Sequence, residues 1–194
     1  MTRPHDVIVV GAGHAGCEAA LAAARMGCRT LIFSITLDMV AHMPCSPSVG
    51  GIGKGHLVKE IDALGGEMAK VTDRTAIQFR ILNTKKGPAV RGTRTQNDKV
   101  LYRRVMKHAL ELQDNLELKQ TLVESLVVEG DRVVGVVDHL GVFFPSQTVV
   151  LATGTFLHGL VHIGRTRVPA GRSGEFPATA LADQLHRMGF TLGR

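Results

Sequence analysis

With 194 residues, of which 44% are hydrophobic and 22 are glycine, the chain has the composition of a soluble α/β protein, which argues against a disordered or fibrous one. The net charge of +6 favours an anionic partner, and no apolar run reaches the eighteen or so residues that a membrane-spanning helix needs. The three cysteines and nine histidines show neither disulfide nor metal-ligand spacing, so we expect a cytoplasmic protein without a metal site.

The N-terminal segment predicts a nucleotide-binding unit. An apolar strand is expected at residues 6–10, an alanine-rich helix at about 14–26 and a second strand at 29–35. Because the first strand already starts at residue 6, we expect no signal or transit peptide. This strand–turn–helix–strand order is the opening of a Rossmann-like α/β domain.

The turn after the first strand carries the dinucleotide fingerprint G-x-G-x-x-G. Gly11 allows a sharp turn, Gly13 lets a pyrophosphate approach bare backbone, and Gly16 lets the helix and the strand pack closely. The acid that usually binds the ribose is missing, since its expected place is held by Ser34, whose hydroxyl can still bond to a ribose. The motif predicts dinucleotide binding, with a purely structural glycine turn as the alternative.

The middle of the chain does not continue the strand–helix–strand order of the N-terminal segment. Residues 36–95 are punctuated by Pro and Gly and contain one amphipathic helix, expected at 56–66. A longer helix is expected at 97–113, with Asn97 as its N-cap. The apolar residues expected on one face of this longer helix are Val100, Leu101, Val105, Ala109 and Leu112. The elements expected after it are strands at 116–120, 124–130, 132–140 and 148–154 and a short helix at 178–189.

The strand at 148–154 helps to decide which dinucleotide is bound. It ends in Ala152-Thr153-Gly154 and follows a β-meander at 124–144. In two-dinucleotide flavoproteins, a meander in this place leads into a strand whose A-T-G turn lies against FAD. The pattern favours FAD over NAD, and the alternative is an ordinary buried strand with a glycine turn.

The segment CSPSVGGIGKGH places a thiol beside a cation and flexible backbone. Cys45 is followed by four glycines and by Lys54, just before the helix expected at residue 56. A nearby cation or helix N-terminus lowers the pKa of a thiol and makes it nucleophilic. The alternative is a small packed thiol, which is what we expect of Cys17 and Cys28. A Walker A loop is excluded, since Gly55 stands where a Ser or Thr must hold magnesium.

The stretch from Arg80 to Lys107 is strongly basic. It contains nine Lys and Arg residues against one acid, a local net charge of +8. This concentration favours contacts to RNA phosphates. A solvated helix face together with FAD-phosphate contacts is the alternative for about half of these charges. Tyr102 is expected to pack inside. The predicted RNA-binding residues, with Lys54 added, are Lys54, Lys85, Lys86, Arg91, Arg94, Arg103 and Arg104.

Four segments of the chain resemble the bacterial tRNA uridine 5-carboxymethylaminomethyl modification enzyme family, called MnmG or GidA. These segments are GAGHAGCEAALAAARMG, CSPSVGGIGKGHLVKEIDALGGEMAKVTD, QFRILNTKKGPAVRGTRTQ and ATGTFLHGLVHIG. The resemblance implies an FAD-dependent enzyme that adds a carboxymethylaminomethyl group at C5 of the wobble uridine, position 34, of certain tRNAs. It implies methylenetetrahydrofolate as the one-carbon donor and NAD(H) as the reductant. The implied partner is a MnmE-type GTPase, bound as a heterotetramer with a homodimer of the complete protein.

The resemblance also implies a domain arrangement. Residues 1–194 are expected to be the N-terminal part of an FAD-binding domain of a longer protein. Within them, 35–95 is an inserted Cys/Gly-rich and basic region, and 155–194 starts an excursion to a second domain. We expect the isolated segment to be inactive and to retain FAD weakly. A flavin oxidoreductase acting on a small molecule and a non-catalytic flavin- or RNA-binding module are the alternatives, because fold alone does not separate them.

The resemblance finally implies roles for single residues. Val123 is expected beside the adenine, and Ala178 stands where the family usually has a serine. Cys45 is expected to add to C6 of the target uracil, or else to hold or resolve the methylene group. The residues expected to contact FAD are Gly11, Ala12, Gly13, His14, Ala15, Gly16, Ser34, Val123, Thr153, Gly154 and Ala178.

Overall fold

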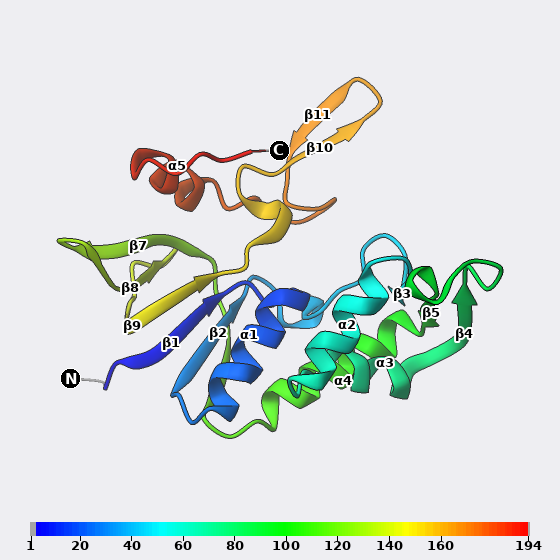
Figure 1. Cartoon of the computed structure of the whole chain (residues 1–194). Coiled ribbons are helices and arrows are strands. Elements are labelled where there is room, and N and C mark those ends of the chain that lie inside the picture. Colours follow the sequence, from blue (N-terminus) through cyan, green and yellow to red (C-terminus); the bar gives the residue numbers. More distant parts are fainter. Residues whose placement is uncertain (1–2, 194) are drawn as a thin grey trace.

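A six-stranded sheet forms the centre of the molecule, in the strand order β6-β2-β1-β9-β8-β7 (Figure 1). The structure is a computed structural model that describes residues 3–193, so the ends of the expected range 1–194 lie outside the described residues. The first four strands in this order run parallel, and the last three form an antiparallel meander. The strands are β1 (His5–Val10), β2 (Thr30–Ser34), β6 (Leu116–Gln120), β7 (Val123–Glu129), β8 (Arg132–Asp138) and β9 (Phe143–Leu151). The Rossmann-like sheet with a meander is therefore confirmed.

Strand β9 joins the two halves of this sheet. Its first residues, Phe143 to Pro145, pair with β8, while Ser146 to Leu151 pair with β1. The meander and the fingerprint strand therefore share one continuous strand. The turn Thr153-Gly154 follows that strand instead of belonging to it, because β9 ends at Leu151 and a short 3-10 helix, η3 (Gly154–Phe156), comes next.

Helices cover both faces of the parallel part. On one face, α1 (His14–Arg25) and α4 (Lys99–Glu111) bury a cluster that includes Leu21 and Met106. On the other face, α5 (Thr179–Arg187) packs Leu181 against Phe33 and its neighbours. The central strands are apolar on both sides because both of their faces lie against helices.

The structure corrects two expectations for α4. Its N-cap is Asp98, whose carboxylate accepts hydrogen bonds from the backbone N–H groups of Val100 and Leu101, both at 2.9 Å. The expected cap, Asn97, is instead buried and ties β5 (Gly92–Asn97) to α3 (Met68–Thr75) through hydrogen bonds to Thr72 and Thr75. The buried face of α4 is also different from the expected one, since Val100, Leu101 and Leu112 are exposed. The fully buried residues are Tyr102, Met106 and Leu110, which confirms that Tyr102 packs.

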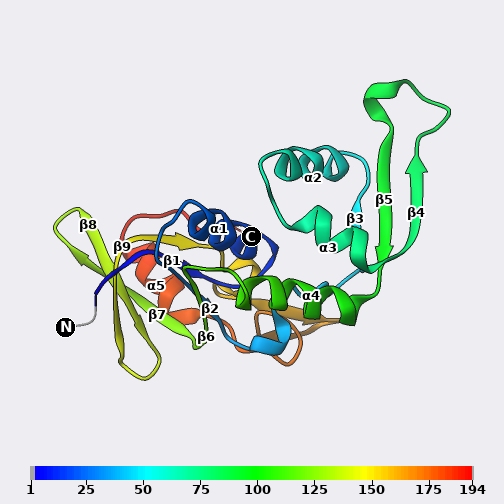
Figure 2. The same cartoon turned by 90° about the horizontal axis from the view of Figure 1, so that it is seen from below.

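Residues 45–97, between β2 and α4, stand beside the central sheet and are called the inserted region below (Figures 1 and 2). It contains a three-stranded antiparallel sheet in the order β3-β5-β4, of which β4 and β5 project as a long hairpin. Its helix α2 begins at Lys54, two residues before the expected start, and a second helix, α3, was not expected. Its elements are β3 (Ser48–Gly50), α2 (Lys54–Ala63), α3 (Met68–Thr75), β4 (Ala76–Leu82) and β5 (Gly92–Asn97).

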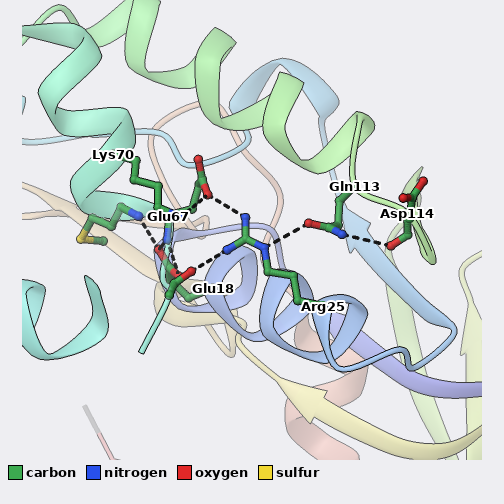
Figure 3. A network of polar contacts seen from close by, with 8 residues as sticks. Glu18, Arg25, Glu67, Lys70, Gln113 and Asp114 are labelled. Carbon is green, nitrogen blue, oxygen red and sulfur yellow. Dashed lines mark hydrogen bonds and ion pairs between the residues drawn. The ribbon is translucent and has the colours of Figure 1, made fainter. Parts of the chain in front are cut away.

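Polar contacts fasten the inserted region to α1 (Figure 3). The Glu18 carboxylate accepts hydrogen bonds from the backbone N–H groups of Glu67, at 3.0 Å, and Met68, at 2.6 Å, at the start of α3. Arg25 forms an ion pair with Glu67 at 2.6 Å and donates a hydrogen bond to the Gln113 side chain at 3.1 Å. Residues of α1 therefore cap a helix of the inserted region.

The C-terminal part leaves the sheet after β9. A two-stranded hairpin of β10 (Leu160–Ile163) and β11 (Thr166–Pro169) projects from the molecule before the chain returns as α5 (Figure 1). In the described residues, no helix has the length and apolar character required to cross a membrane.

Candidate functional site

A cavity of about 350 Å³ opens at the carboxyl ends of β1, β2 and β9. This edge of a parallel sheet is where α/β proteins bind nucleotides. Most of the predicted cofactor residues line it, although they come from distant parts of the chain. These lining residues are Gly11, Ala12, Gly13, His14, Ser34, Val123, Thr153, Gly154 and Ala178.

The three fingerprint glycines differ in what surrounds them. Gly11 has a φ of +106°, and a Cβ there would lie 2.5 Å from the backbone oxygen of Ala152. A Cβ at Gly16 would overlap the backbone oxygen of Gly11, so this glycine lets α1 pack against the turn. A Cβ at Gly13 would meet no atom within 4 Å. Gly11 and Gly16 are therefore required by packing, whereas Gly13 adjoins open space at the cavity.

The N-terminus of α1 faces this open space. Its N-cap is Gly13, and no side chain caps it, so its first backbone N–H groups and positive dipole end are available to an anion. An uncapped helix end beside open space fits the diphosphate of a dinucleotide.

Two neutral histidines line the same cavity. Burial lowers the pKa of His14 to about 4, and Lys54 and His42 add to the effect, so the ring carries no charge at neutral pH. The His14 ring packs edge-on against Tyr102 with 5.7 Å between centroids. Burial, followed by Arg172 and other nearby cations, also lowers the pKa of His42. The Nδ1 atoms of both rings are buried and find no hydrogen-bond partner within residues 3–193, so a polar ligand in the cavity could satisfy them.

The remaining predicted cofactor residues differ in whether they can contact a ligand in the cavity. The Ser34 hydroxyl lines the cavity and donates to the Thr36 backbone oxygen at 2.8 Å, which leaves its lone pairs for a ligand donor. The Ala178 N–H donates to the Phe156 backbone oxygen at 2.8 Å, so this backbone donor is already used. Ala15 and Gly16 lie outside the cavity lining, in the first turn of α1.

Several cavity residues were missed by the sequence analysis. Arg172 and Glu175 form an ion pair at the cavity, and the Arg172 guanidinium lies over the Phe156 ring, 5.3 Å from its centroid. All three come from the segment after β9, which returns to the sheet through tertiary packing. The only local signal was the three-residue spacing of Arg172 and Glu175.

Cys45 lies next to the cavity without lining it. Its side chain is exposed, and the preceding residue, Pro44, belongs to the lining. Lys54 is the first residue of α2, and its Nζ donates to the backbone oxygen of Ser48 at 3.2 Å; burial lowers its pKa. The structure therefore puts an exposed thiol beside the cavity, on the segment that leads to α2, whose first residue is Lys54.

The other cysteines are separate from this loop. Cys17 is fully buried, and burial raises the pKa of its thiol to about 12, which confirms a packing role. Cys28 is only half-buried. Within residues 3–193, no group of three or more His, Cys, Asp or Glu side chains is placed to hold a metal ion.

The predicted RNA-binding residues lie mostly on the projecting hairpin. Lys85, Lys86 and Arg91 are exposed at its tip, and Arg94 is exposed on β5. Arg103 differs from these, because its guanidinium donates to the Asp38 backbone oxygen at 2.7 Å and contacts the Met39 sulfur. Arg104 is exposed on α4, and Lys54 is exposed at the start of α2 as a whole residue, although its ammonium end is partly desolvated where it contacts Ser48.

Comparisons with known proteins agree with this arrangement. Residues 6–194 match the family described as "Glucose inhibited division protein A". The chain is 76% identical over 98% of its length to the tRNA uridine 5-carboxymethylaminomethyl modification enzyme MnmG of Syntrophobacter fumaroxidans and covers 30% of that protein. It is 62% identical over 99% of its length to the MnmG of Geobacter sulfurreducens and covers 31% of it.

Solved structures show the same fold. GidA of Aquifex aeolicus in its form II crystal superposes with a TM-score of 0.93 at 50% identity, over 97% of this chain and 31% of that one. The GidA-related protein of Thermus thermophilus gives a TM-score of 0.72 at 26% identity, over 97% of this chain and 70% of that one. The chain spans about 30% of the length of the curated relatives that it matches.

Proposed function

The chain belongs to the glucose inhibited division protein A family, and from this premise we propose that it forms the FAD-binding N-terminal part of a tRNA uridine-modifying enzyme. The observation that carries the proposal is the cavity at the end of β1, where an uncapped helix N-terminus adjoins the open space at Gly13. The relatives named MnmG, at 76% and 62% identity, support tRNA as the substrate.

Residues of this chain would hold FAD along the cavity. The backbone N–H groups at the start of α1 would bind the diphosphate, and Ser34 would bind a ribose hydroxyl. The backbone of Val123 would lie beside the adenine, and the Thr153-Gly154 turn would contact the flavin half. Bound FAD supplies two-electron redox chemistry.

Cys45 would act on the uracil base. In this proposal the Sγ–C6 bond forms first, and the C5=C6 electron pair moves onto C5 and O4. C5 then bonds to a methylene electrophile carried by folate. The C=N electron pair of the folate-borne methylene passes to the folate nitrogen, and loss of the C5 proton with departure of the thiolate restores the C5=C6 bond. An amine, glycine or ammonium, then replaces the folate nitrogen on the methylene carbon, and the folate nitrogen leaves with the electron pair of the broken C–N bond and takes up a proton. The exposure of Cys45 beside Pro44 gives a base access to its sulfur from outside.

The wider assignment follows the family. The product would be 5-carboxymethylaminomethyl uridine at position 34, made with methylenetetrahydrofolate as the one-carbon donor and NAD(H) as the reductant. A MnmE-type GTPase would bind the homodimer of the complete protein as a heterotetramer in the cytoplasm. Residues 35–95 would form an insertion in the FAD-binding domain, and 155–194 would lead to a second domain.

A flavin titration tests the cofactor site. Increasing amounts of the chain are added to FAD, and the quenching of flavin fluorescence gives the dissociation constant. Gly13→Glu should weaken binding at least tenfold, because the new carboxylate fills the open space and repels a diphosphate. Ala22→Glu adds the same charge at an exposed position of the same helix and should leave binding unchanged. Equal affinities of the two variants for FAD would show that the diphosphate does not bind at this turn.

A chimaera tests the role of the thiol. This chain replaces the matching segment of the Syntrophobacter fumaroxidans relative, and modified uridine is measured in tRNA. Cys45→Ser should abolish product while FAD binding, measured as above, stays intact. Normal turnover of the Cys45→Ser chimaera would end the nucleophile proposal.

A further inference from the structure

The projecting hairpin places two arginines directly opposite each other. In the antiparallel register of β4 and β5, Arg80 pairs with Arg94, and Arg94 pairs in turn with Gly50 of β3. Directly opposed residues on one face have Cβ atoms about 4.5–5.5 Å apart, and like charges in such positions are destabilising. Both arginines are exposed.

Acidic side chains do not compensate for these charges. Neither arginine takes part in an ion pair within residues 3–193. The neighbouring cross-strand row is polar and uncharged, with Gln78 opposite Gln96 and Gln96 opposite Ser48. The free protein therefore keeps an exposed pair of guanidinium groups whose charges an anion would neutralise.

This face leads directly to the Cys45 loop. The Arg94 Nη2 lies 3.5 Å from the Ser48 hydroxyl, and the Ser46 hydroxyl donates to the same Ser48 oxygen at 3.2 Å. Lys54 donates to the Ser48 backbone oxygen. Ser48, three residues after Cys45, thus has polar contacts with two cations and with the neighbour of the thiol.

We propose that Arg80 and Arg94 clamp one phosphodiester group of an RNA strand and so position a nucleotide at Cys45. The inference rests on the proposed function for the identity of the RNA, and it adds Arg80 to the residues that bind it. Guanidinium groups bind phosphate oxygens through paired hydrogen bonds, and neutralising the anion relieves the repulsion between the two side chains.

The shape of the surface favours RNA over a free nucleotide. The clamp lies on an exposed strand face outside the cavity, whereas sites for small molecules are concave. The same hairpin carries further exposed cations at its tip, Lys85, Lys86 and Arg91, which are available to other phosphates of the same strand.

RNA binding tests the clamp. The affinity of the chain for a fluorescein-labelled anticodon stem–loop is measured by anisotropy at several salt concentrations. The double variant Arg80→Gln/Arg94→Gln should bind at least tenfold more weakly, and the slope of log K against log salt should fall in magnitude by about 0.7–0.9, because the contact to one phosphate is lost. The control Arg132→Gln/Arg167→Gln removes the same charge from exposed positions on β8 and β11 and should stay within about threefold of the unchanged chain.

The possible outcomes separate the clamp from the proposed function. If the double variant binds RNA as its control does, the clamp is wrong and the substrate assignment is unaffected. If no form of the chain binds the RNA, both the clamp and the tRNA assignment lose their support, while the flavin titration still reports on the FAD site.

Two further measurements identify the source of the phosphate and the structural effect of the pair. ADP should displace the RNA no better than inorganic phosphate does; displacement by ADP at thousandfold lower concentration would assign the clamp to a free nucleotide and overturn the proposal. The double variant should also melt about 1–3 °C higher, because it removes a repulsive pair. A lower melting temperature would show that the arginines hold the hairpin together and would overturn the repulsion on which the clamp depends.

Discussion

The central sheet and the inserted region use their residues in opposite ways. In the central sheet, most residues of the inner strands β1 and β2 are buried, and the site is made largely of backbone, as at Gly13. In the inserted region, strand β4 is an edge that leaves Ile77 74% exposed and Phe79 58% exposed, and its candidate site consists of exposed side chains such as Cys45. Substitutions of packed residues in the first region should therefore damage stability, whereas substitutions of exposed side chains in the second region should leave stability nearly unchanged.

The largest effect is expected at the fingerprint helix. Gly16→Ala should lower the free energy of unfolding by about 3 kcal/mol or more, because its Cβ would overlap the Gly11 carbonyl and backbone must move. Gly13→Ala is the matched control and should change stability by less than about 0.5 kcal/mol, since its Cβ meets open space. Urea unfolding followed by circular dichroism measures both. Similar losses in the two variants would contradict the contrast between the packed and the open glycine.

The second largest effect is a pH dependence of the free energy of unfolding, which arises from His14 next to the central sheet. His14 has a pKa of about 4 in the folded chain and about 6.5 when unfolded, so between these values the unfolded state binds more protons. Its contribution to stability is complete above pH 6.5 and is lost as the pH falls towards 4, by about 2–3 kcal/mol. Urea unfolding at a series of pH values should show this loss in the unchanged chain and a smaller one in His14→Asn. Parallel curves would show that His14 is not the group responsible.

A smaller effect is expected where the two regions meet. Glu18→Ala removes the acceptor for the N–H groups of Glu67 and Met68 and should cost about 1–2 kcal/mol. Hydrogen exchange should speed up in α3 while the strands of the central sheet keep their protection. Glu129→Ala, at an exposed position of the meander, is the control and should leave exchange unchanged. Faster exchange throughout the sheet would mean that the two regions unfold as one unit.

The smallest effect is expected for the exposed thiol. Cys45→Ser should change the free energy of unfolding by less than about 0.5 kcal/mol, because the side chain is exposed. Cys17→Ser places a hydroxyl in the core and should cost about 1 kcal/mol. Thermal unfolding of both variants measures the difference. A larger cost at Cys45 than at Cys17 would reverse the comparison on which these predictions are based.

The sheet could be predicted from the sequence because its signals are local. Continuous apolar runs gave β1 and β2, and the glycine spacing placed the turn beside them. In the inserted region, β3 is only three residues long and β5 is polar, so neither has an apolar pattern. Strand β4 does alternate, with Ile77, Phe79 and Ile81 on one face, but those residues are exposed.

Two errors remained: the buried face of α4 was assigned to the wrong residues, and two residues of the cavity were missed. In α4 the buried residues Tyr102, Met106 and Leu110 recur every four positions, and this spacing identifies the buried face better than the exposed Val100 and Leu101 do. The cavity residues Arg172 and Glu175 reach the site only because the chain returns after β10 and β11. No local pattern reports such a return, since it depends on packing between distant segments.

Helix α1 contacts the cavity at its N-terminus and the inserted region through Glu18 and Arg25. Its first turn faces the cavity, and one turn later Glu18 holds the start of α3, while Arg25 at its last turn holds Glu67. The distance between the cavity and the inserted region is thereby set by the rise of one rigid element instead of by a flexible linker. A displacement of α1 would therefore carry the start of α3 with it.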